Sequence, residues 1–337
     1  METLYFAESD ESFVGRLEQE LRNVFKENES IAIKLHMGER KNPNHLKPGF
    51  VKKVVGVLKA IGVKPFLFDS PVMYNSDRHT VEGYKKQCEE LGFTEQVVGC
   101  PVMVSDESID ASGKYMPYQV CRHLAEADGV LVLTHFKGHG CTGIGGSIKN
   151  LGMGALTKKS KGDIHTGAQP QQDLSGKCAL CKKCMEVCPV NCITYNDGKG
   201  DESGPCFDYD ACYGCSKCIQ NCPQKCLTPK VAEMDILLAD GAATAFGKFK
   251  KVYFVNVIRS ITNRCDCARA DFRVVLPDIG ILMGKDIVAI DMASLYLVNQ
   301  KAGKKLFDEL WHKDSELQIR EAGRLGMGQP VYEIKDA

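Results

Sequence analysis

The sequence has no excess charge of either sign and no long apolar run. Its 337 residues include 43 Lys plus Arg and 43 Asp plus Glu, so the formal net charge is zero. A neutral chain has no overall field that attracts nucleic acid or an anionic membrane. No apolar run approaches the roughly 20 residues that a membrane-spanning helix needs. We therefore expect neither nucleic acid nor a membrane as a partner.

The amino terminus also lacks the pattern of a secretory signal. METLYFAESDESF carries acidic residues where a signal has positive charge followed by an apolar core. The 17 cysteines are odd in number, and eight of them have the spacing of cluster ligands, which disfavours a disulfide framework. A reducing, cytoplasmic location fits better.

Cysteine is abundant in one stretch, from Cys178 to Pro223, which contains the run C-x2-C-x2-C-x3-C-P twice. The second copy begins 34 residues after the first, and all four cysteines and the proline recur. This run is the bacterial ferredoxin pattern for a 4Fe-4S cluster, in which the last cysteine binds the other cluster. The predicted ligands of the first cluster are Cys178, Cys181, Cys184 and Cys222, and those of the second are Cys212, Cys215, Cys218 and Cys188.

Structural zinc is the alternative for this stretch, because paired C-x2-C motifs also bind zinc. Tetrahedral zinc requires neither a third cysteine at the same spacing nor the C-x3-C-P ending, so the pattern favours iron and sulfur. Three neighbouring cysteines lie outside the pattern, namely Cys192, Cys206 and Cys226. We expect them to be small buried apolar residues.

Hydrophobic periodicity predicts an α/β fold with a mostly parallel sheet covered by helices. Helical periodicity covers four segments, 12–26, 48–61, 84–91 and 118–127, and a further helix is predicted over 304–323. Short apolar runs predict strands over 31–36, 65–69, 129–135 and 251–258. One of these strands follows the cysteine repeat. The predicted organisation is therefore one α/β domain, residues 1–172 and 230–337, with an inserted two-cluster ferredoxin domain over 173–229.

Several predicted strands end in chemically capable residues. These are His36, Asp69, His135 and Arg259. In open parallel sheets, ligands bind beyond the carboxyl ends of the strands, so we expect a site there. Taken singly, each residue could equally be a loop residue or a hydrogen-bonded group at the sheet edge.

A glycine-rich loop follows the strand that ends at His135. Its glycines are Gly138, Gly140, Gly143, Gly145 and Gly146. A helix is predicted to begin near Ser147, with Lys149 in its first turn, and such a loop favours an anionic substrate or cofactor. The spacing matches neither the dinucleotide fingerprint nor the Walker loop. The alternative is a tight turn where the helix packs on the strand.

The motif Cys265-Asp266-Cys267 lies far from the cysteine repeat in sequence. Its two thiolates could bind a further metal or cluster, together with Cys141, or act as a redox-active thiol pair. Two partly buried, inert cysteines are the alternative. His135, His139 and His165, with His36 as a fourth, could form a metal set, but histidines four apart share a face only on a helix and this stretch is loop-like. A role for one of them, such as His135, as general acid is favoured instead. The predicted catalytic residues are Cys265, Cys267, His135 and Lys149.

The combination of motifs resembles a known family. GHGCTGIGGSIKNLGMG, NRCDC and PDIGILMGKDIVAID, together with a central two-cluster ferredoxin, are similar to the domain-of-unknown-function 362 family of iron-sulfur cluster-binding proteins. The resemblance extends from about residue 36 to about residue 303. It implies an α/β domain with a ferredoxin insert and a redox role, and it implies no particular substrate.

The sequence therefore predicts an iron-sulfur oxidoreductase. It would pass electrons through two 4Fe-4S clusters to a small, anionic substrate or cofactor at the strand-end crevice. A redox protein would serve as electron donor or acceptor, and the chain could form a homodimer. A further metal, cluster or organic redox cofactor is left open. Two alternatives are an electron-carrier subunit that docks a partner enzyme, and a non-redox lyase or isomerase.

Overall fold

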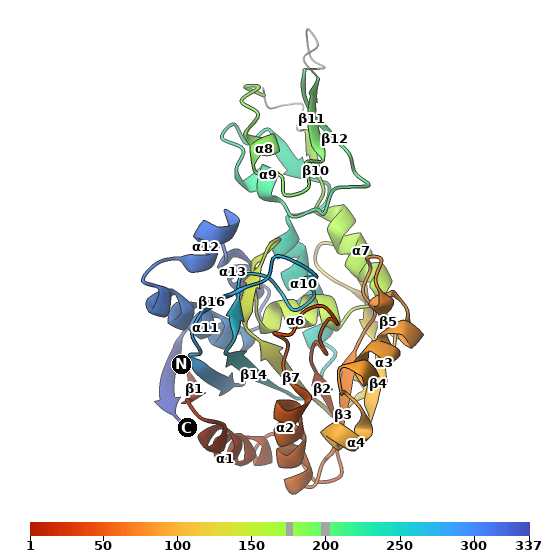
Figure 1. Cartoon of the computed structure of the whole chain (residues 1–337), viewed down its shortest axis with the longest axis vertical. Coiled ribbons are helices and arrows are strands. Elements are labelled where there is room, and N and C mark those ends of the chain that lie inside the picture. Colours follow the sequence, from red (N-terminus) through yellow and green to blue (C-terminus); the bar gives the residue numbers. More distant parts are fainter. Residues whose placement is uncertain (173–177, 197–202) are drawn as a thin grey trace.

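The computed structural model describes residues 1–172, 178–196 and 203–337 (Figure 1). Its core is an eight-stranded sheet in the order β18-β1-β17-β14-β7-β2-β3-β4. The strands are β1 (Glu2–Ala7), β2 (Ser30–Lys34), β3 (Lys64–Asp69), β4 (Val102–Val104), β7 (Gly129–His135), β14 (Val252–Ile258), β17 (Gly280–Gly284) and β18 (Tyr332–Asp336). Only β17 runs antiparallel to its neighbours in this sheet. The predicted α/β fold with a mostly parallel sheet is confirmed.

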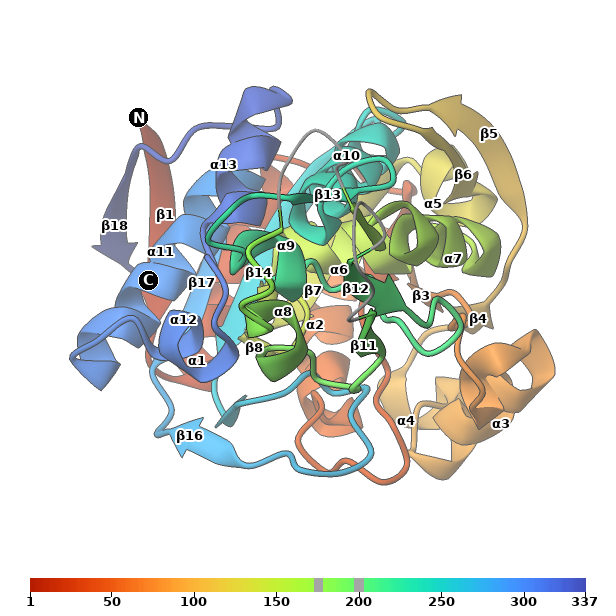
Figure 2. The same cartoon turned by 90° about the horizontal axis from the view of Figure 1, so that it is seen from above.

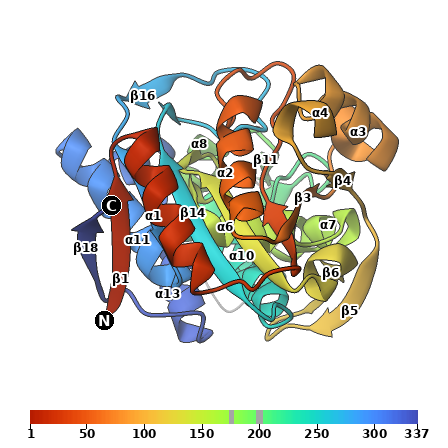
Figure 3. The ribbon, with the colours of Figure 1, turned by 90° about the horizontal axis from the view of Figure 1, so that it is seen from below.

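Helices cover both faces of the sheet. On one face lie α1 (Asp10–Arg22) and α2 (Pro48–Ala60), which Figure 3 shows side by side. On the other face lie α6 (Ser147–Gly154), α10 (Met234–Phe246), α11 (Ile287–Ala302) and α13 (Leu317–Arg324). Strand β7 contributes alternate side chains to the two cores, Val130 and Val132 to one and Leu131 and Leu133 to the other. Both faces of β7 are therefore buried, as its unbroken apolar run predicts.

The remaining elements are short and connect this framework. They are a 3-10 helix (Asp77–His79), α3 (Val81–Glu90), α4 (Glu95–Val98), β5 (Ser108–Ser112), β6 (Pro117–Cys121), α5 (Arg122–Glu126), β8 (Lys137–His139), β9 (Gly143–Gly145), α7 (Lys158–Gly167), β15 (Ile261–Thr262), β16 (Val274–Leu276) and α12 (Leu306–Trp311). No helix within the described residues is both long and apolar enough to cross a membrane.

Two helix predictions were wrong in part. Over 118–127, the first half is strand β6, which pairs antiparallel with β5, and only α5 is helical. Tyr118 and Val120 are buried and alternate with the less buried Pro117 and Gln119, a period of two that suits a strand paired with β5. Over 304–323, the predicted helix is split into α12 and α13 at His312, which has a left-handed φ of 50°.

The split at His312 has a tertiary cause. The next residue, Lys313, is buried and forms an ion pair with Asp235 of α10. Its ammonium also donates a hydrogen bond to the carbonyl oxygen of Cys215, 3.1 Å away. A continuous helix would have to give up this contact with the cysteine-rich segment, and helical periodicity carries no information about it.

The cysteine-rich segment, residues 178–196 and 203–229, projects from one end of the α/β body (Figure 1). At its base, β10 (Pro170–Gln172) pairs antiparallel with β13 (Leu227–Pro229). The last central-sheet strand before the segment, β7, and the first one after it, β14, are hydrogen-bonded neighbours. The segment therefore interrupts one sheet. Its predicted start at 173 lies outside the described residues.

Candidate functional site

The two cysteine runs share one backbone conformation. Leu180 and Lys182 have left-handed φ angles of 53° and 59°, and their counterparts 34 residues later, Gly214 and Ser216, have 61° and 60°. Each run then enters a single helical turn, α8 (Lys183–Glu186) or α9 (Lys217–Gln220). Three of these four residues are not glycine. The left-handed conformation is uncommon for other residues and clusters at functional sites.

Backbone amides in these loops point at the cysteine sulfurs. The N–H of Leu180 donates to Sγ of Cys178, and the N–H of Gly214 donates to Sγ of Cys212, both over 3.4 Å. Such donors stabilise thiolates and sulfide. The repeat seen in the sequence is thus also a repeat of structure.

The first predicted ligand set converges in space. Cys178, Cys181, Cys184 and Cys222 line one pocket, together with Cys226. In the second set, Sγ of Cys188 lies 3.5 Å from Sγ of Cys192, which in turn contacts Cys212. Donor sets made of sulfur alone are compatible with a bound metal or an iron-sulfur cluster.

Two of the three cysteines outside the pattern are buried, as expected. Cys192 and Cys226 are 6% and 2% exposed, and they occupy equivalent positions in the two runs. Cys206 is exposed, so the prediction of burial was wrong for it. It lies on β12 (Gly204–Phe207), which pairs only with β11 (Ile193–Asn196), and the two form a two-stranded sheet.

The second cysteine run packs against the α/β body, whereas the first faces solvent. The carbonyl oxygen of Tyr213 lies 2.7 Å from Nδ1 of His165 on α7, and Lys313 binds the carbonyl of Cys215. Cys141 of the glycine-rich loop is close to Cys215; burial and this neighbour raise the pKa of its thiol to about 12. In the first run, Cys181 is exposed. Viewed from above, the segment covers the middle of the body (Figure 2).

At the carboxyl end of the sheet, three of the four predicted residues lie at or just beyond the ends of neighbouring strands, His36 after β2, Asp69 on β3 and His135 on β7. Asp69 forms a buried ion pair with Lys34, 3.0 Å apart. His36 is buried, and Nε2 of its ring lies 2.7 Å from the guanidinium of Arg78. Burial and this cation hold the pKa of His36 well below its usual range. The fourth residue, Arg259, binds Asp10 at the start of α1.

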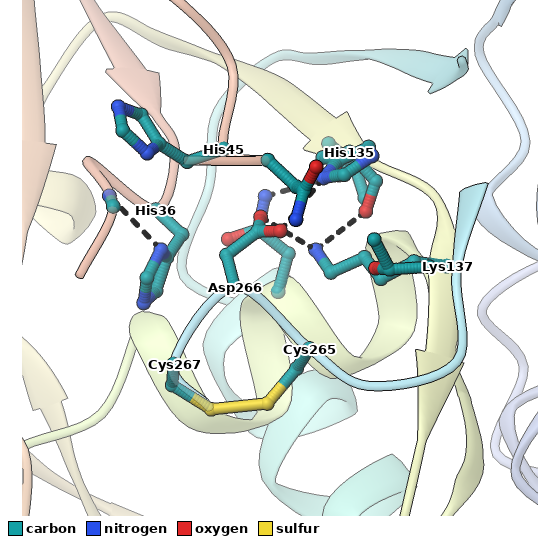
Figure 4. Close-up of polar contacts among 12 residues, drawn as sticks. His36, His45, His135, Lys137, Cys265, Asp266 and Cys267 are labelled. Atoms are coloured by element: carbon teal, nitrogen blue, oxygen red, sulfur yellow. Dashed lines mark hydrogen bonds and ion pairs between the residues drawn. A yellow bond between two sulfur atoms is a disulfide. The ribbon is translucent and has the colours of Figure 1, made fainter. Parts of the chain in front are cut away.

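Asp266 was not singled out by the sequence, although it organises this region (Figure 4). Its Oδ1 lies 2.8 Å from Nδ1 of His135, and its Oδ2 lies 3.2 Å from Nζ of Lys137. Burial alone would raise the pKa of Asp266, but His135 and Lys137 lower it well below the ordinary value. The carboxylate is therefore ionised. The signal available in the sequence was an acidic residue placed between two cysteines.

Cys265 and Cys267 are joined by a disulfide (Figure 4). A ring nitrogen of His139 and the two sulfurs all lie within 4.8 Å of one another, a group capable of holding a metal ion. Cys141, expected to join the pair, is not part of this group, and His139, which was not expected to bind a metal, is. Burial and the nearby Lys149 hold the pKa of His139 well below its usual range, so its imidazole is neutral.

Helix α6 begins at Ser147 as predicted, but a side chain of the protein occupies its amino terminus. The amides of Ser147 and Ile148 donate to the carboxylate of Asp291 over 2.8 and 2.9 Å. Burial raises the pKa of Asp291 to about 6. The expectation that these amides bind an external anion was wrong, because α11 supplies the anion.

Close packing explains why most of the positions in the glycine-rich loop are glycine. A Cβ atom on Gly138 would lie 2.3 Å from the carbonyl oxygen of Asn263, and one on Gly146 would meet Asp291 at 2.5 Å. Gly143 has a φ of 70° and lies against Ser315. A ligand-binding role for these glycines, and for Gly140 and Gly145, stays a prediction.

Lys149 remains as a cation without a counterion. It makes no hydrogen bond or ion pair with any residue in the described part of the chain, and its stem lies over Gly145 beside that of Lys137. Burial and the neighbouring charge of Lys137 lower the pKa of Lys149 to about 8. Because an unpaired ammonium in such a place is costly, it favours an incoming anion.

A family model for a domain of unknown function, DUF362, matches residues 31–296. The chain belongs to the DUF362 family. This confirms the family suggested by the motifs and covers both the strand-end residues and the cysteine repeat. No curated protein matches this DUF362 chain.

Two solved structures are similar to the DUF362 chain. One is a protein from Thermotoga maritima, with 11% identity and a TM-score of 0.47, covering 88% of this chain and 59% of that protein. The other is the lactate racemase apoprotein from Thermoanaerobacterium thermosaccharolyticum, with 15% identity and a TM-score of 0.35, covering 77% of this chain. The chain spans 51% of the racemase.

Proposed function

We propose that this protein is an iron-sulfur oxidoreductase acting on a small anionic substrate or cofactor. Cys178, Cys181, Cys184 and Cys222 would hold one 4Fe-4S cluster, and Cys212, Cys215, Cys218 and Cys188 the other. When bound, the clusters would supply single-electron transfer. The remaining roles belong to side chains of the α/β domain.

The observation that carries this proposal is the attachment of the second cysteine run to the α/β body. Lys313 is buried and bridges the carbonyl of Cys215 and the carboxylate of Asp235. The amide of Met234 donates to Oγ of Ser216 over 2.9 Å. These buried contacts fix the run beside the glycine-rich loop, and a segment that served only as a detachable carrier would not need them.

The substrate site would lie between the glycine-rich loop and the strand ends. Lys149 would bind the anionic group of the substrate, since it has no counterion among the described residues. Lys137 is held by Asp266 and would add positive charge beside it. Both ring nitrogens of His135 face acceptors, so Nδ1 donates to the carboxylate of Asp266 and Nε2 donates to the carbonyl oxygen of Arg259, each over 2.8 Å. Its role is to position Asp266.

Cys265 and Cys267 would act as a two-electron store beside this site. Reduction of their disulfide takes up two electrons and two protons and yields two thiols. In a reducing cytoplasm, a disulfide between cysteines two residues apart is more typical of redox function than of structural stabilisation. The exposed first run, with Cys181 at the surface, would exchange electrons with a redox protein.

The test is reoxidation of the anaerobic protein after reduction by dithionite. Small anionic acceptors should reoxidise the wild type, and Lys149→Met should slow this reaction at least tenfold with unchanged iron content. Lys159→Met is the matched control, since Lys159 is exposed and pairs with Asp163 one helical turn away on α7. Reoxidation by a protein extract alone, and by no small acceptor, would support the electron-carrier alternative instead.

A further inference from the structure

His139, Cys265 and Cys267 come from two separate loops and meet at one point. His139 ends β8, whereas the two cysteines follow β15, and their ligand atoms lie within 4.8 Å of one another. Cys265 is buried, and the other two are partly buried. One imidazole and two sulfurs are a donor set suited to zinc and other thiophilic divalent ions.

The hydrogen bonds of His139 decide which ring nitrogen is free for a metal. Oγ1 of Thr142 lies 2.8 Å from the carbonyl oxygen of Ile144, to which it donates its only proton. The same oxygen lies 2.9 Å from Nδ1 of His139 and can therefore only accept from it. In the tautomer with its proton on Nδ1, His139 donates to Thr142 and presents a lone pair on Nε2.

A hydrogen bond from Nδ1 to an oxygen is the contact that commonly orients a metal-binding histidine. Such a histidine donates its second ring N–H to an oxygen, which fixes the tautomer and the ring orientation. The Nε2 atom of His139 has no hydrogen-bond partner among the residues that the structure describes. The amide N–H of Cys141 donates to Nδ1 over 3.2 Å, so a metal on Nε2 has to displace this contact when the proton moves to Nδ1.

We propose that Cys265, Cys267 and His139 form a redox-gated site for a thiophilic divalent cation such as Zn²⁺. In the disulfide form the sulfurs are bonded to each other and cannot act as thiolates. Two-electron reduction by a phosphine or a dithiol breaks the S–S bond and yields two thiols. The cation then displaces both thiol protons and binds two thiolates and Nε2 of His139.

Three protein ligands leave one position of a tetrahedral ion open. Structural zinc sites use four protein ligands, whereas catalytic sites use three and keep the fourth for water or substrate. Cys141 lies outside the group and does not close the site. An oxygen of a small anion would take the fourth position, a consequence that rests on the proposed function, whereas metal binding itself does not.

The test is uptake of Zn²⁺ by the full, iron-loaded chain under anaerobic conditions. Protein reduced with a phosphine should retain about one Zn²⁺ after desalting, and the disulfide form should retain none. Zinc K-edge X-ray absorption should show two sulfur ligands and at least one histidine nitrogen. Equal retention by the reduced and disulfide forms would overturn the proposal.

Variants separate this site from the cysteine-rich segment. Cys265→Ser and His139→Gln should each lose the retained zinc with iron content unchanged, whereas Cys141→Ser and His45→Gln should retain it. If His139→Gln and Cys265→Ser both bind zinc as the wild type does, the site is refuted. Iron content and reoxidation are measured on the same samples, so loss of the clusters is distinguished from loss of the zinc site.

Discussion

Oδ1 of Asp266 lies 2.8 Å from Nδ1 of His135, and this contact ties the cysteine pair to the end of the central strand β7. The carboxylate sits between Cys265 and Cys267 in sequence, so the ion pair positions both sulfurs. Lys137 completes the anchor from β8. The positions of the thiols therefore depend on a buried charge network, which makes the network testable.

Asp266→Asn should lower the free energy of unfolding by about 3 kcal/mol near pH 7, because it leaves Lys137 buried without a counterion. The pKa of Asp266 is depressed in the folded state, so the contribution exists above the ordinary carboxyl pKa of about 4 and fades as pH falls further. Urea unfolding at several pH values measures this. Asp271→Asn is the control, since Asp271 is exposed in the same loop, and equal effects would contradict the anchor.

Lys149→Met should make the protein more stable while it impairs anion binding. The pKa of Lys149 is about 8 when folded and about 10.4 when unfolded, so its charge opposes folding by about 1 to 3 kcal/mol at pH 7. The unfolded chain holds the extra proton between these values, so wild-type stability should rise with pH across this interval. The stability of Lys149→Met should rise less with pH over the same interval, because the variant lacks this ammonium. Urea unfolding at pH 7 and pH 10 checks both statements.

Lys161 provides the contrast to Lys149. Lys161 is buried, whereas Lys149 is partly buried, and burial lowers the pKa of Lys161 to about 8. Its ammonium donates to Oγ of Ser70 over 2.8 Å and to the carbonyl of Pro71 over 2.6 Å. Lys161→Met should therefore destabilise the protein, because it leaves buried acceptors unpaired. A stabilising effect of Lys161→Met, or a destabilising effect of Lys149→Met, would refute the distinction between the two lysines.

Cys222 and Cys226 test the assignment of cluster ligands. Their sulfurs lie 3.5 Å apart, and both line the first pocket. Cys222→Ser should reduce iron from about eight to about four atoms per chain, whereas Cys226→Ser should keep about eight. Anaerobic iron and sulfide analysis decides this. Loss of iron in Cys226→Ser, with iron unchanged in Cys222→Ser, would contradict the assignment of Cys222 as the cluster ligand.

Two glycines of the same loop should differ in their tolerance of a side chain. Gly138→Ala should cost about 1 to 3 kcal/mol of stability, because its Cβ atom would meet the carbonyl oxygen of Asn263 at 2.3 Å. Gly140→Ala should change stability by less than about 0.5 kcal/mol, since its nearest contact is Trp311 at 3.6 Å. Thermal unfolding of both variants compares them directly, and a large cost at Gly140 would contradict close packing as the reason for Gly138.

The sequence was informative wherever a local pattern determined the outcome. The apolar run that ends at His135 predicted β7 to the residue, and Pro48 at the first turn of α2 marked its start. The 34-residue spacing of the cysteines predicted a repeat that is also visible in the backbone at Leu180 and Gly214. Spacing and periodicity are local quantities, so one sequence suffices to read them.

What the sequence missed depends on contacts between distant residues. Asp291 is 144 residues from Ser147, and no local pattern indicates that it occupies the amino terminus of α6. His139 was set aside as a ligand because no helical spacing linked it to another histidine, yet the fold brings it to Cys265 and Cys267. Such groups become visible only when the loops at the strand ends are placed together.

The metal content of the full chain, purified and analysed without oxygen, tests the central claim most directly. The account predicts about eight iron atoms and about eight acid-labile sulfides per chain. Zinc in place of iron in the cysteine-rich segment would contradict it.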